Sequence, residues 1–548
     1  MKHIFHLATI VLALCTLSCQ GDPASSPSEA SLSGDRISAH VKFLSGDALG
    51  GRGPATPGET LTTEYIATQF ALAGLKPAGD DGSYFQKVPL VGVQSLPETD
   101  LSWQGGGKKL RMNWLEDYVA VNHRQQASQT IDAEAIYVGH GIVAPEFDWD
   151  DYKGVDVKGK VVVLFTNEPQ SQDPAFFGGK ALTYYGRWVF KYEEALRQGA
   201  AGAIIIHTLP TAGYPWTVVR NSWGGRNPYV KLAEGEPALG VAGWVTSPTG
   251  ERILTQTGKS LDELLKEADS PDFQPVPLKL GLRGRISSRV QPFDTRNVIG
   301  IVEGSDPRKN DEAVLYSAHW DHLGEGIAVD GDSIYNGAVD NATGCGILLE
   351  LARAFSELEQ PPARSILFAA VGAEEGGLRG SKYYSEHPVV PVGKTAVNLN
   401  YDGLMPLGLS TDISLPGYER TTLRQTVERL AEKFQLEIRP EAHPEQGYYY
   451  RSDHFSLAKA GVPAFSIKSG TQYQGRPEDW GAQAREQYTA NDYHQPSDEF
   501  DPSWDFSGLE QIARFGFAIG REVANQPELP TWNPGDEFLA AREKSWAR

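Results

Sequence analysis

Strand-like and helix-like segments alternate along the sequence from about residue 290 onward. Short apolar runs, such as 313–316 and 365–371, are followed by longer segments with helical spacing, such as 346–358 and 421–434. Strands that alternate with helices build a largely parallel sheet, because each connecting helix crosses back over one face of the sheet. The sequence therefore predicts an α/β fold with a mixed, largely parallel central sheet flanked by helices.

The chain divides into segments of different character. Its 548 residues are enough for two or three domains. Residues 35–114 carry helical spacing, and residues 285–530 carry the alternation of strands and helices. Residues 115–284 are rich in Gly and Trp and carry strand-like runs but no tight cluster of His, Asp and Glu, so they form a β-rich block of different character. Residues 531–548 remain as a C-terminal tail.

The balance of charge and the cysteine count exclude several classes of function. There are 50 basic and 70 acidic residues, which gives a net charge of −20. A nucleic-acid partner is therefore not expected, because phosphate binding needs a basic face. Cys345 is the only cysteine beyond the first 19 residues, so neither an internal disulfide nor a thiolate metal cage is expected in the folded part of the chain.

The first 34 residues have the features of an export signal and a tether. A positive start at 1–3 precedes an apolar run at 4–14 that is too short to cross a bilayer. A small residue precedes Cys19, as at a bacterial lipoprotein cleavage site. We interpret 1–19 as a lipoprotein-type signal peptide and 20–34 as a flexible tether. The expected location is the periplasm or outer membrane of a bacterium, with lipid on Cys19 as the only membrane contact; plain secretion is the alternative.

Polar side chains gather where the predicted strands end. In a parallel sheet these carboxyl ends meet at one edge, where functional groups collect. Taken singly, each residue has a structural interpretation, such as a turn, a helix cap or an exposed pair. Their joint appearance at successive strand ends favours a site for zinc or another divalent transition metal, which His nitrogens and carboxylate oxygens bind well. The residues concerned are His319, Asp321, Asp340, Glu374, Glu375, Asp402 and His494.

The order and spacing of these residues resemble the M28 family of co-catalytic di-zinc metallopeptidases, which includes aminopeptidases and glutamate carboxypeptidase. The resemblance covers about 35–110 and 285–527. Residues 115–284 resemble, in general character, the protease-associated (PA) domain that some branches of the family carry as an insertion. The matching motifs are His-x-Asp at 319–321, Gly-x-x-Asp-Asn-x-x-Gly at 337–344, Glu-Glu-x-Gly-x-x-Gly-Ser at 374–381, Asp-Gly at 402–403, Tyr-x-x-Ser-Asp-His at 449–454 and a late His494.

The resemblance implies a site for two Zn²⁺ ions. His319 and Asp402 would bind one ion, Glu375 and His494 would bind the other, and Asp340 would bridge both. The family often has a cis peptide bond after the bridging residue, which here is the Asp340–Asn341 bond. Val339 stands where the family usually has another Asp, but that position is not a ligand.

Three further residues receive roles from the same resemblance. Asp321 would accept the second ring N–H of His319 and fix its tautomer. Glu374 would act as general base toward a hydroxide that bridges the metals. Tyr449 would donate to the oxyanion, with Tyr450 as the runner-up.

Several nearby polar residues are expected to lie outside the site. His322, His443 and His454 are not expected to be ligands, and Asp453 stays unassigned. Arg379 and Arg451 flank the motifs and could meet a substrate carboxylate, but we favour a role in packing or surface pairing.

The expected function is zinc-dependent hydrolysis of N-terminal residues from peptides. A carboxypeptidase of the glutamate-releasing type is the alternative; it would need an arginine cluster for the terminal carboxylate, and no dense arginine patch is visible in the sequence. A glutaminyl cyclase shares the fold but typically uses one zinc. A catalytically dead receptor is a further alternative, although such a copy should have lost ligand positions. The inserted block is expected to cover the site, and contacts with a second copy of the chain are also open to it.

Overall fold

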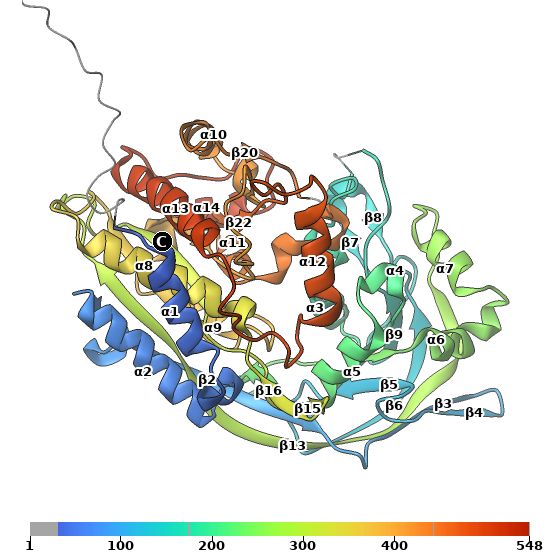
Figure 1. The fold of residues 1–548 in the computed structure, drawn as a ribbon. Coiled ribbons are helices and arrows are strands. Elements are labelled where there is room, and N and C mark those ends of the chain that lie inside the picture. The colour runs from blue at the N-terminus through green and yellow to red at the C-terminus, as the bar shows by residue number, and fades with distance from the viewer. Residues whose placement is uncertain (1–30, 174–175, 442, 547–548) are drawn as a thin grey trace, which may run out of the picture.

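A computed structural model describes residues 31–173, 176–441 and 443–546. Two sheets share one long strand, β13 (Val276–Val302), which runs beneath both halves of the molecule in Figure 1. The predicted signal peptide and most of the predicted tether lie outside the described residues. Within those residues, no helix is both long enough and apolar enough to cross a bilayer.

The first sheet has a parallel centre, as the sequence predicts. Its parallel strands run in the order β21 (Ala464–Ser466), β18 (Thr395–Asn400), β14 (Ala313–His319) and β17 (Ser365–Val371). The strand β13 then pairs with β17 in the antiparallel direction. The sheet is extended by three more antiparallel strands: β2 (Phe85–Ser95), β1 (Lys76–Pro77) and β11 (Asn227–Val230).

Helices cover both faces of this sheet. Every residue of β14 is buried, and its side chains alternate between two cores, with Tyr316 on one side and Leu315 on the other. Burying one large apolar side chain is worth about 1.5–3 kcal/mol, so burial on both faces fixes the register of the strand. The helices on the Tyr316 side are α1 (Gly34–Leu44), α2 (Pro57–Leu72), α8 (Thr343–Ser356) and α13 (Ser507–Asn525), and those on the other side include α9 (Arg379–Glu386) and α11 (His454–Lys459).

The second sheet is also mixed and also covered by helices. Its parallel strands are β6 (Ser128–Tyr137), β9 (Val161–Phe165), β10 (Gly202–Ile206) and β12 (Val241–Val245). Antiparallel strands β5 (Tyr118–Val121), β3 (Asp100–Gly105) and β4 (Lys108–Arg111) complete it together with β13. The helices packed on it are α3 (Trp188–Arg197), α5 (Trp216–Gly224), α6 (Ser247–Leu254) and α7 (Leu261–Ala268). The PA assignment and the 115–284 bounds stay predictions.

The two lobes, each built on one sheet, meet through a short segment that precedes α3. The amide of Leu182 donates to the carbonyl of Pro444 at 2.9 Å, and the ring of Tyr184 packs on Phe455 with centroids 4.8 Å apart. In Figure 1, α12 (Trp480–Asn491) is seen between the lobes. The remaining strands form small separate sheets: β7 (Val143–Ala144) with β8 (Trp149–Asp150), β15 (Gly324–Val329) with β16 (Asp332–Tyr335), and β19 (Asp412–Ser414) with β20 (Glu437–Ile438) and β22 (Lys468–Ser469). The remaining α-helices are α4 (Leu209–Ala212), α10 (Arg424–Lys433) and α14 (Leu539–Trp546).

Candidate metal centre

The parallel strands of the first sheet end in register. His319, the last residue of β14, is paired with Val371, the last residue of β17, and Ser317 is paired with Asn400, the last residue of β18. The next few residues of each strand therefore leave the sheet at the same edge. This register brings Glu374 and Asp402 to His319, although they are distant in sequence.

Asp340 reaches the same edge from the loop before α8. The Asp340–Asn341 peptide bond is cis, as the resemblance predicts. The amide nitrogen of the Asn341 side chain donates to the carbonyl of Tyr401 at 2.9 Å, which ties the loop to the end of β18. The carboxylate of Asp498 accepts the backbone N–H groups of Val339 at 2.9 Å and Asp340 at 3.1 Å. The loop is thus held on two sides.

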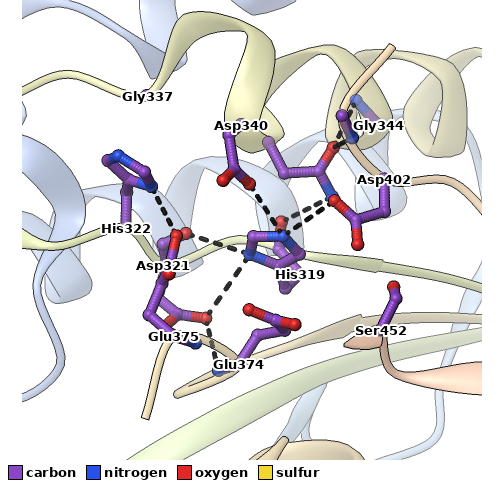
Figure 2. Close-up of polar contacts among 12 residues, drawn as sticks. His319, Asp321, His322, Gly337, Asp340, Gly344, Glu374, Glu375, Asp402 and Ser452 are labelled. Atoms are coloured by element: carbon purple, nitrogen blue, oxygen red, sulfur yellow. Dashed lines mark hydrogen bonds and ion pairs between the residues drawn. The ribbon is translucent and has the colours of Figure 1, made fainter. Parts of the chain in front are cut away.

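The two oxygens of Asp340 face two different histidines. Its Oδ1 lies 3.2 Å from Nε2 of His319, and its Oδ2 lies 3.4 Å from Nε2 of His494. Asp402 completes the first group, with Oδ1 3.4 Å from His319 Nε2, as Figure 2 shows. Glu375 completes the second group, with Oε2 3.1 Å from His494 Nε2. The five predicted ligands therefore form two groups that share one carboxylate.

A sharp turn after β17 separates Glu374 from Glu375. Ala373 has a positive φ of 56°, which turns the chain immediately before the pair. The carboxylate of Asp321 accepts the backbone N–H groups of Glu374 at 3.0 Å and Glu375 at 3.4 Å. These bonds hold the turn, so that the two glutamates keep separate positions.

The contact predicted between Asp321 and His319 takes a different form. The Asp321 carboxylate lies 3.9 Å from His319 Nδ1, too far for a hydrogen bond. The backbone carbonyl of Asp321 lies 3.2 Å from the same ring nitrogen and is positioned to accept its proton. The carboxylate is unavailable because the amides after β17 draw it toward them.

Crowded carboxylates dominate the electrostatics of the site. Burial lowers the pKa of a histidine, but Glu374, Asp340 and Asp402 outweigh that effect and hold the pKa of His319 well above its usual value. Burial, with the charge on Glu375 as a further cause, raises the pKa of Glu374 well above its usual value. Burial raises the pKa of Asp321 to about 7. Concentrated negative charge of this kind calls for a cation.

The set of donors fits divalent metal ions. Each group combines an imidazole nitrogen with carboxylate oxygens, which is the ligand type that zinc accepts. Within the described residues, no lysine or arginine side chain forms an ion pair with these carboxylates. Three sets of side chains within this cluster bring their ligand atoms within 4.8 Å of one another, namely His319–Glu374–Glu375, His319–Asp340–Asp402 and His322–Asp340–Glu375.

His322 lies inside the cluster, where the sequence did not place it. Its Nδ1 is 2.6 Å from Oε1 of Glu375, and the side chain is fully buried. Glu375 therefore faces two imidazoles, His322 through one oxygen and His494 through the other. His322 falls one residue beyond the His-x-Asp motif, so it was not predicted to belong to the site. Nothing in the local sequence distinguishes a histidine that contacts Glu375 from one that does not.

Arg52 binds backbone segments that carry two of the predicted ligands, and the sequence did not predict these contacts. Its buried guanidinium donates to four backbone carbonyls and to no carboxylate among the described residues. Two of these bonds, to Trp320 at 2.8 Å and Gly337 at 2.8 Å, reach the segments that carry His319 and Asp340. In the sequence, Arg52 is only an arginine in a Gly-rich turn at 50–53. That pattern does not predict contacts with residues almost 300 positions away.

Tyr449 is not brought to the cluster. Its hydroxyl donates to the carbonyl of Ala464 at 3.1 Å, and its ring packs against His454 with centroids 4.8 Å apart. The hydroxyl of Tyr450 donates to Glu537 at 3.1 Å. The oxyanion role of either tyrosine stays a prediction. His443 is also remote in its contacts, since it is exposed and pairs with Glu445.

Comparison with known proteins supports the same reading of this region. The model of peptidase family M28 matches residues 297–515. Leupeptin-inactivating enzyme 1 of Streptomyces exfoliatus is 28% identical over 189 residues, which are 34% of this chain and 39% of that protein. A glutamate carboxypeptidase 2 homolog of Caenorhabditis briggsae is 25% identical over 320 residues, 49% of this chain and 37% of that protein.

Two further similarities are to aminopeptidases. A probable lipoprotein aminopeptidase of Mycobacterium tuberculosis, LpqL, is 27% identical over 242 residues, 40% of this chain and 43% of that protein. The alignments thus span less than half the length of these curated relatives. The solved aminopeptidase from Aneurinibacillus sp. strain AM-1 superposes with a TM-score of 0.53 at 19% identity, covering 93% of this chain and 98% of that chain. The fold is therefore shared over nearly the whole molecule.

Proposed function

We propose that this chain is a metal-dependent exopeptidase of peptidase family M28 that removes N-terminal residues from peptides; the match of the family model to residues 297–515 supports the family. The observation that carries the proposal is the placement of Asp340, whose two oxygens face His319 and His494 separately. A carboxylate shared between two groups of ligands suits a pair of metal ions, which is the arrangement used for hydrolysis of peptide bonds.

We assign the ligands in two sets. His319 and Asp402 would hold one Zn²⁺, Glu375 and His494 would hold the other, and Asp340 would belong to both. When bound, the ions would act as Lewis acids that make water nucleophilic at neutral pH and polarise the scissile carbonyl. The side chain of Asp321 would keep the turn at Glu374 and Glu375 in place through its two backbone hydrogen bonds.

Glu374 is the proposed general base. Its carboxylate lies beside His319 and Glu375 but faces neither Asp340 nor His494 in any contact that the described residues form. A carboxylate with this freedom can take a proton from the attacking water and pass it to the leaving amine. Glu375, one residue later, is already engaged by His322 and His494 and is less suited to that role.

Release of C-terminal residues is the second candidate. The similarity to a glutamate carboxypeptidase 2 homolog over 49% of this chain supports it, because that alignment is the longest of the three sequence alignments described above. The presence of every predicted ligand residue, with these side chains close together, argues against a catalytically dead receptor.

A panel of short peptides with and without a chelator tests the proposal. We expect hydrolysis of peptides with a free N-terminus and little hydrolysis of peptides with a blocked N-terminus. A chelator should abolish the hydrolysis of both kinds of peptide, and added zinc should restore it. Hydrolysis that survives N-terminal blocking and depends on the C-terminal residue would transfer the proposal to the carboxypeptidase. Absence of any chelator-sensitive hydrolysis would contradict both.

We also propose that the chain is exported and anchored through lipid on Cys19, and that the second lobe limits access to the site. The apolar run at 4–14 and the small residue before Cys19 support the first proposal, together with the similarity to a probable lipoprotein aminopeptidase. Labelling with a radioactive fatty acid should mark the wild-type chain and not Cys19→Ala. Label retained by the variant would contradict the anchor.

A further inference from the structure

Residues 372–380 form the tight turn between β17 and α9, and this turn carries Glu374 and Glu375. The carboxylate of Asp321 supports it by accepting the backbone N–H groups of both glutamates. The next residue, Gly376, contacts a different part of the chain. The turn is therefore supported from two parts of the molecule.

The part that contacts Gly376 is β11, which belongs to the segment 115–284. In the sequence β11 lies between α5 and β12 of the second lobe, but it pairs with β2 at the edge of the first sheet. A Cβ atom at Gly376 would lie 2.0 Å from Cγ of Pro228, in β11, and 2.9 Å from its Cδ. Gly376 does not have a positive φ, so its backbone alone would accept a side chain. The rigid proline ring is what excludes one.

Arg379 ties the same strand to the end of the turn. Its Nε donates to the carbonyl of Pro228 at 3.0 Å, and its guanidinium lies over the ring of Tyr229, 4.9 Å from the centroid. Tyr229 also packs against His123, with ring centroids 5.1 Å apart. His123 in turn meets Tyr192 of α3 edge to face at 5.7 Å. A continuous series of contacts thus runs from α3 of the second lobe to the turn.

We propose that β11 is a positioning strand of the active site. Pro228 and its bond from Arg379 hold one side of the turn while Asp321 holds the other, and together they keep Glu374 and Glu375 in place. Such support matters because a displacement of about 1 Å at a reacting group can cost about 100-fold in rate. The second lobe thus acts on the chemistry as well as on access to the site. This inference rests on the proposed function, which supplies the roles of the two glutamates.

A methyl group placed against Pro228 tests the contact in the full-length chain. Gly376→Ala should displace the turn, weaken the binding of zinc to chelator-treated protein by about 10- to 100-fold and lower kcat by about tenfold or more. Gly225→Ala is the matched control. Gly225 lies two residues before β11 with a φ of −88°, and a Cβ atom there would meet only the carbonyl oxygen of Asn221, at 3.9 Å. Its zinc affinity and kcat should equal those of the wild type.

A second substitution that removes the proline ring should reverse the loss. In the double variant Gly376→Ala/Pro228→Ala, Cγ and Cδ are gone and the nearest remaining side-chain atom of residue 228, its Cβ, is 3.3 Å from the new methyl group. Zinc affinity and kcat should recover by about tenfold or more relative to Gly376→Ala.

Arg379→Met tests the same support without adding bulk. It removes the hydrogen bond to the carbonyl of Pro228 and should weaken zinc binding by about three- to tenfold. The unfolding midpoint shows whether each variant is folded, and Arg379→Met decides if Gly376→Ala is not.

Each outcome separates the two proposals. Zinc affinity and kcat in Gly376→Ala equal to those in Gly225→Ala would overturn the positioning role. A loss that Pro228→Ala does not reverse would also overturn it, because the clash would then lie elsewhere. Wild-type zinc affinity in Arg379→Met would do the same. No hydrolysis by the wild type would instead contradict the proposed function, and the zinc titrations would still test the strand.

Discussion

The two sheets place similar residues at similar positions and use them differently. In the second sheet, His140 follows β6, Glu168 follows β9 and His207 follows β10, just as His319 ends β14 and Glu374 follows β17 in the first. A histidine or carboxylate just past a parallel strand is therefore common to both lobes. Position at a strand end is not by itself evidence of a site.

The difference lies in what these side chains contact. In the second lobe His140 pairs with Asp269 at 2.9 Å, Glu168 accepts from the backbone of Thr183 at 2.6 Å, and His207 donates to the carbonyl of Tyr214 at 2.9 Å. Each is satisfied by its own partner. In the first lobe the carboxylates converge on shared histidines, and no lysine or arginine among the described residues pairs with them; this imbalance distinguishes the candidate metal centre.

The largest expected difference between the lobes is the effect of neutralising one strand-end glutamate in each. Glu374→Gln should lower kcat by about 10²- to 10⁴-fold while zinc content stays at the wild-type level, because it removes the base and no proposed ligand. Glu168→Gln, the matched strand-end change in the second lobe, should retain kcat within about threefold. Steady-state kinetics and metal analysis of both proteins measure the contrast.

Two results would contradict this assignment. Loss of zinc in Glu374→Gln would mean that the roles of Glu374 and Glu375 are exchanged. An equal loss of kcat in Glu168→Gln would mean that the satisfied residues of the second lobe also take part in the chemistry.

A second pair of variants compares two buried arginines. Arg52→Lys should weaken zinc binding by about 10- to 100-fold, because lysine cannot donate to Trp320 and Gly337 together and the segments carrying His319 and Asp340 lose their common support. Arg364→Lys, which disturbs bonds to Glu312 and Val523 away from the cluster, should lower the unfolding midpoint but not zinc affinity. Calorimetric zinc titration distinguishes them, and equal affinity losses would show that Arg52 has no specific role.

The buried charges of the second lobe should make its stability depend on pH. Burial raises the pKa of Glu168 from 4.5 to about 7. Burial also lowers the pKa of Lys191 to about 7, although the charges of Asp151, Glu168 and Glu194 oppose that shift. A carboxyl with a higher pKa in the folded chain binds its proton more tightly there, so the folded state loses stability as pH rises between these values. Lys191 stays charged in both states over most of this range.

Replacing Glu168 removes that dependence. Between about pH 5 and 7, Glu168→Gln should gain about 1–3 kcal/mol of stability relative to the wild type. Unfolding in denaturant at several pH values measures the gain. A constant difference between the two proteins across this range would show that Glu168 titrates normally.

The smallest effect is expected at Tyr449. Since its hydroxyl is bonded to Ala464, Tyr449→Phe should cost about 1 kcal/mol of stability and change kcat by less than about threefold. A loss of about 10²-fold in kcat at unchanged stability would instead place the hydroxyl on the oxyanion, as the resemblance to the family implies. The kinetics and thermal unfolding of Tyr449→Phe show whether the hydroxyl acts on Ala464 or on the oxyanion.

The sequence was sufficient for the features that repeat at short range. Apolar runs and helical spacing located β14, β17 and α8, and the motif order predicted which residues would meet at the strand ends. The parallel register then follows from burial on both faces of the sheet, since a slip by one residue would expose the apolar side chains of β14.

Contacts between residues far apart in the sequence could not be predicted from the sequence. Arg52 reaches carbonyl groups after β14 and before α8, and a guanidinium bound to backbone leaves no sequence pattern in its partners. The Asp321 carboxylate was expected on His319, but the amides after β17 compete for it. Pro228 and Gly376 were not recognised as a contact, because only the fold brings β11 to the turn after β17.

The most direct measurement is the number of divalent ions that the chain binds at the edge of the first sheet. Zinc titrated into chelator-treated protein should reach two ions per chain in the wild type, and Asp340→Ala should lose tight binding of both, because both groups share that carboxylate. Fewer than one ion per chain in the wild type, or full binding of two ions by Asp340→Ala, would contradict a bridged two-metal centre.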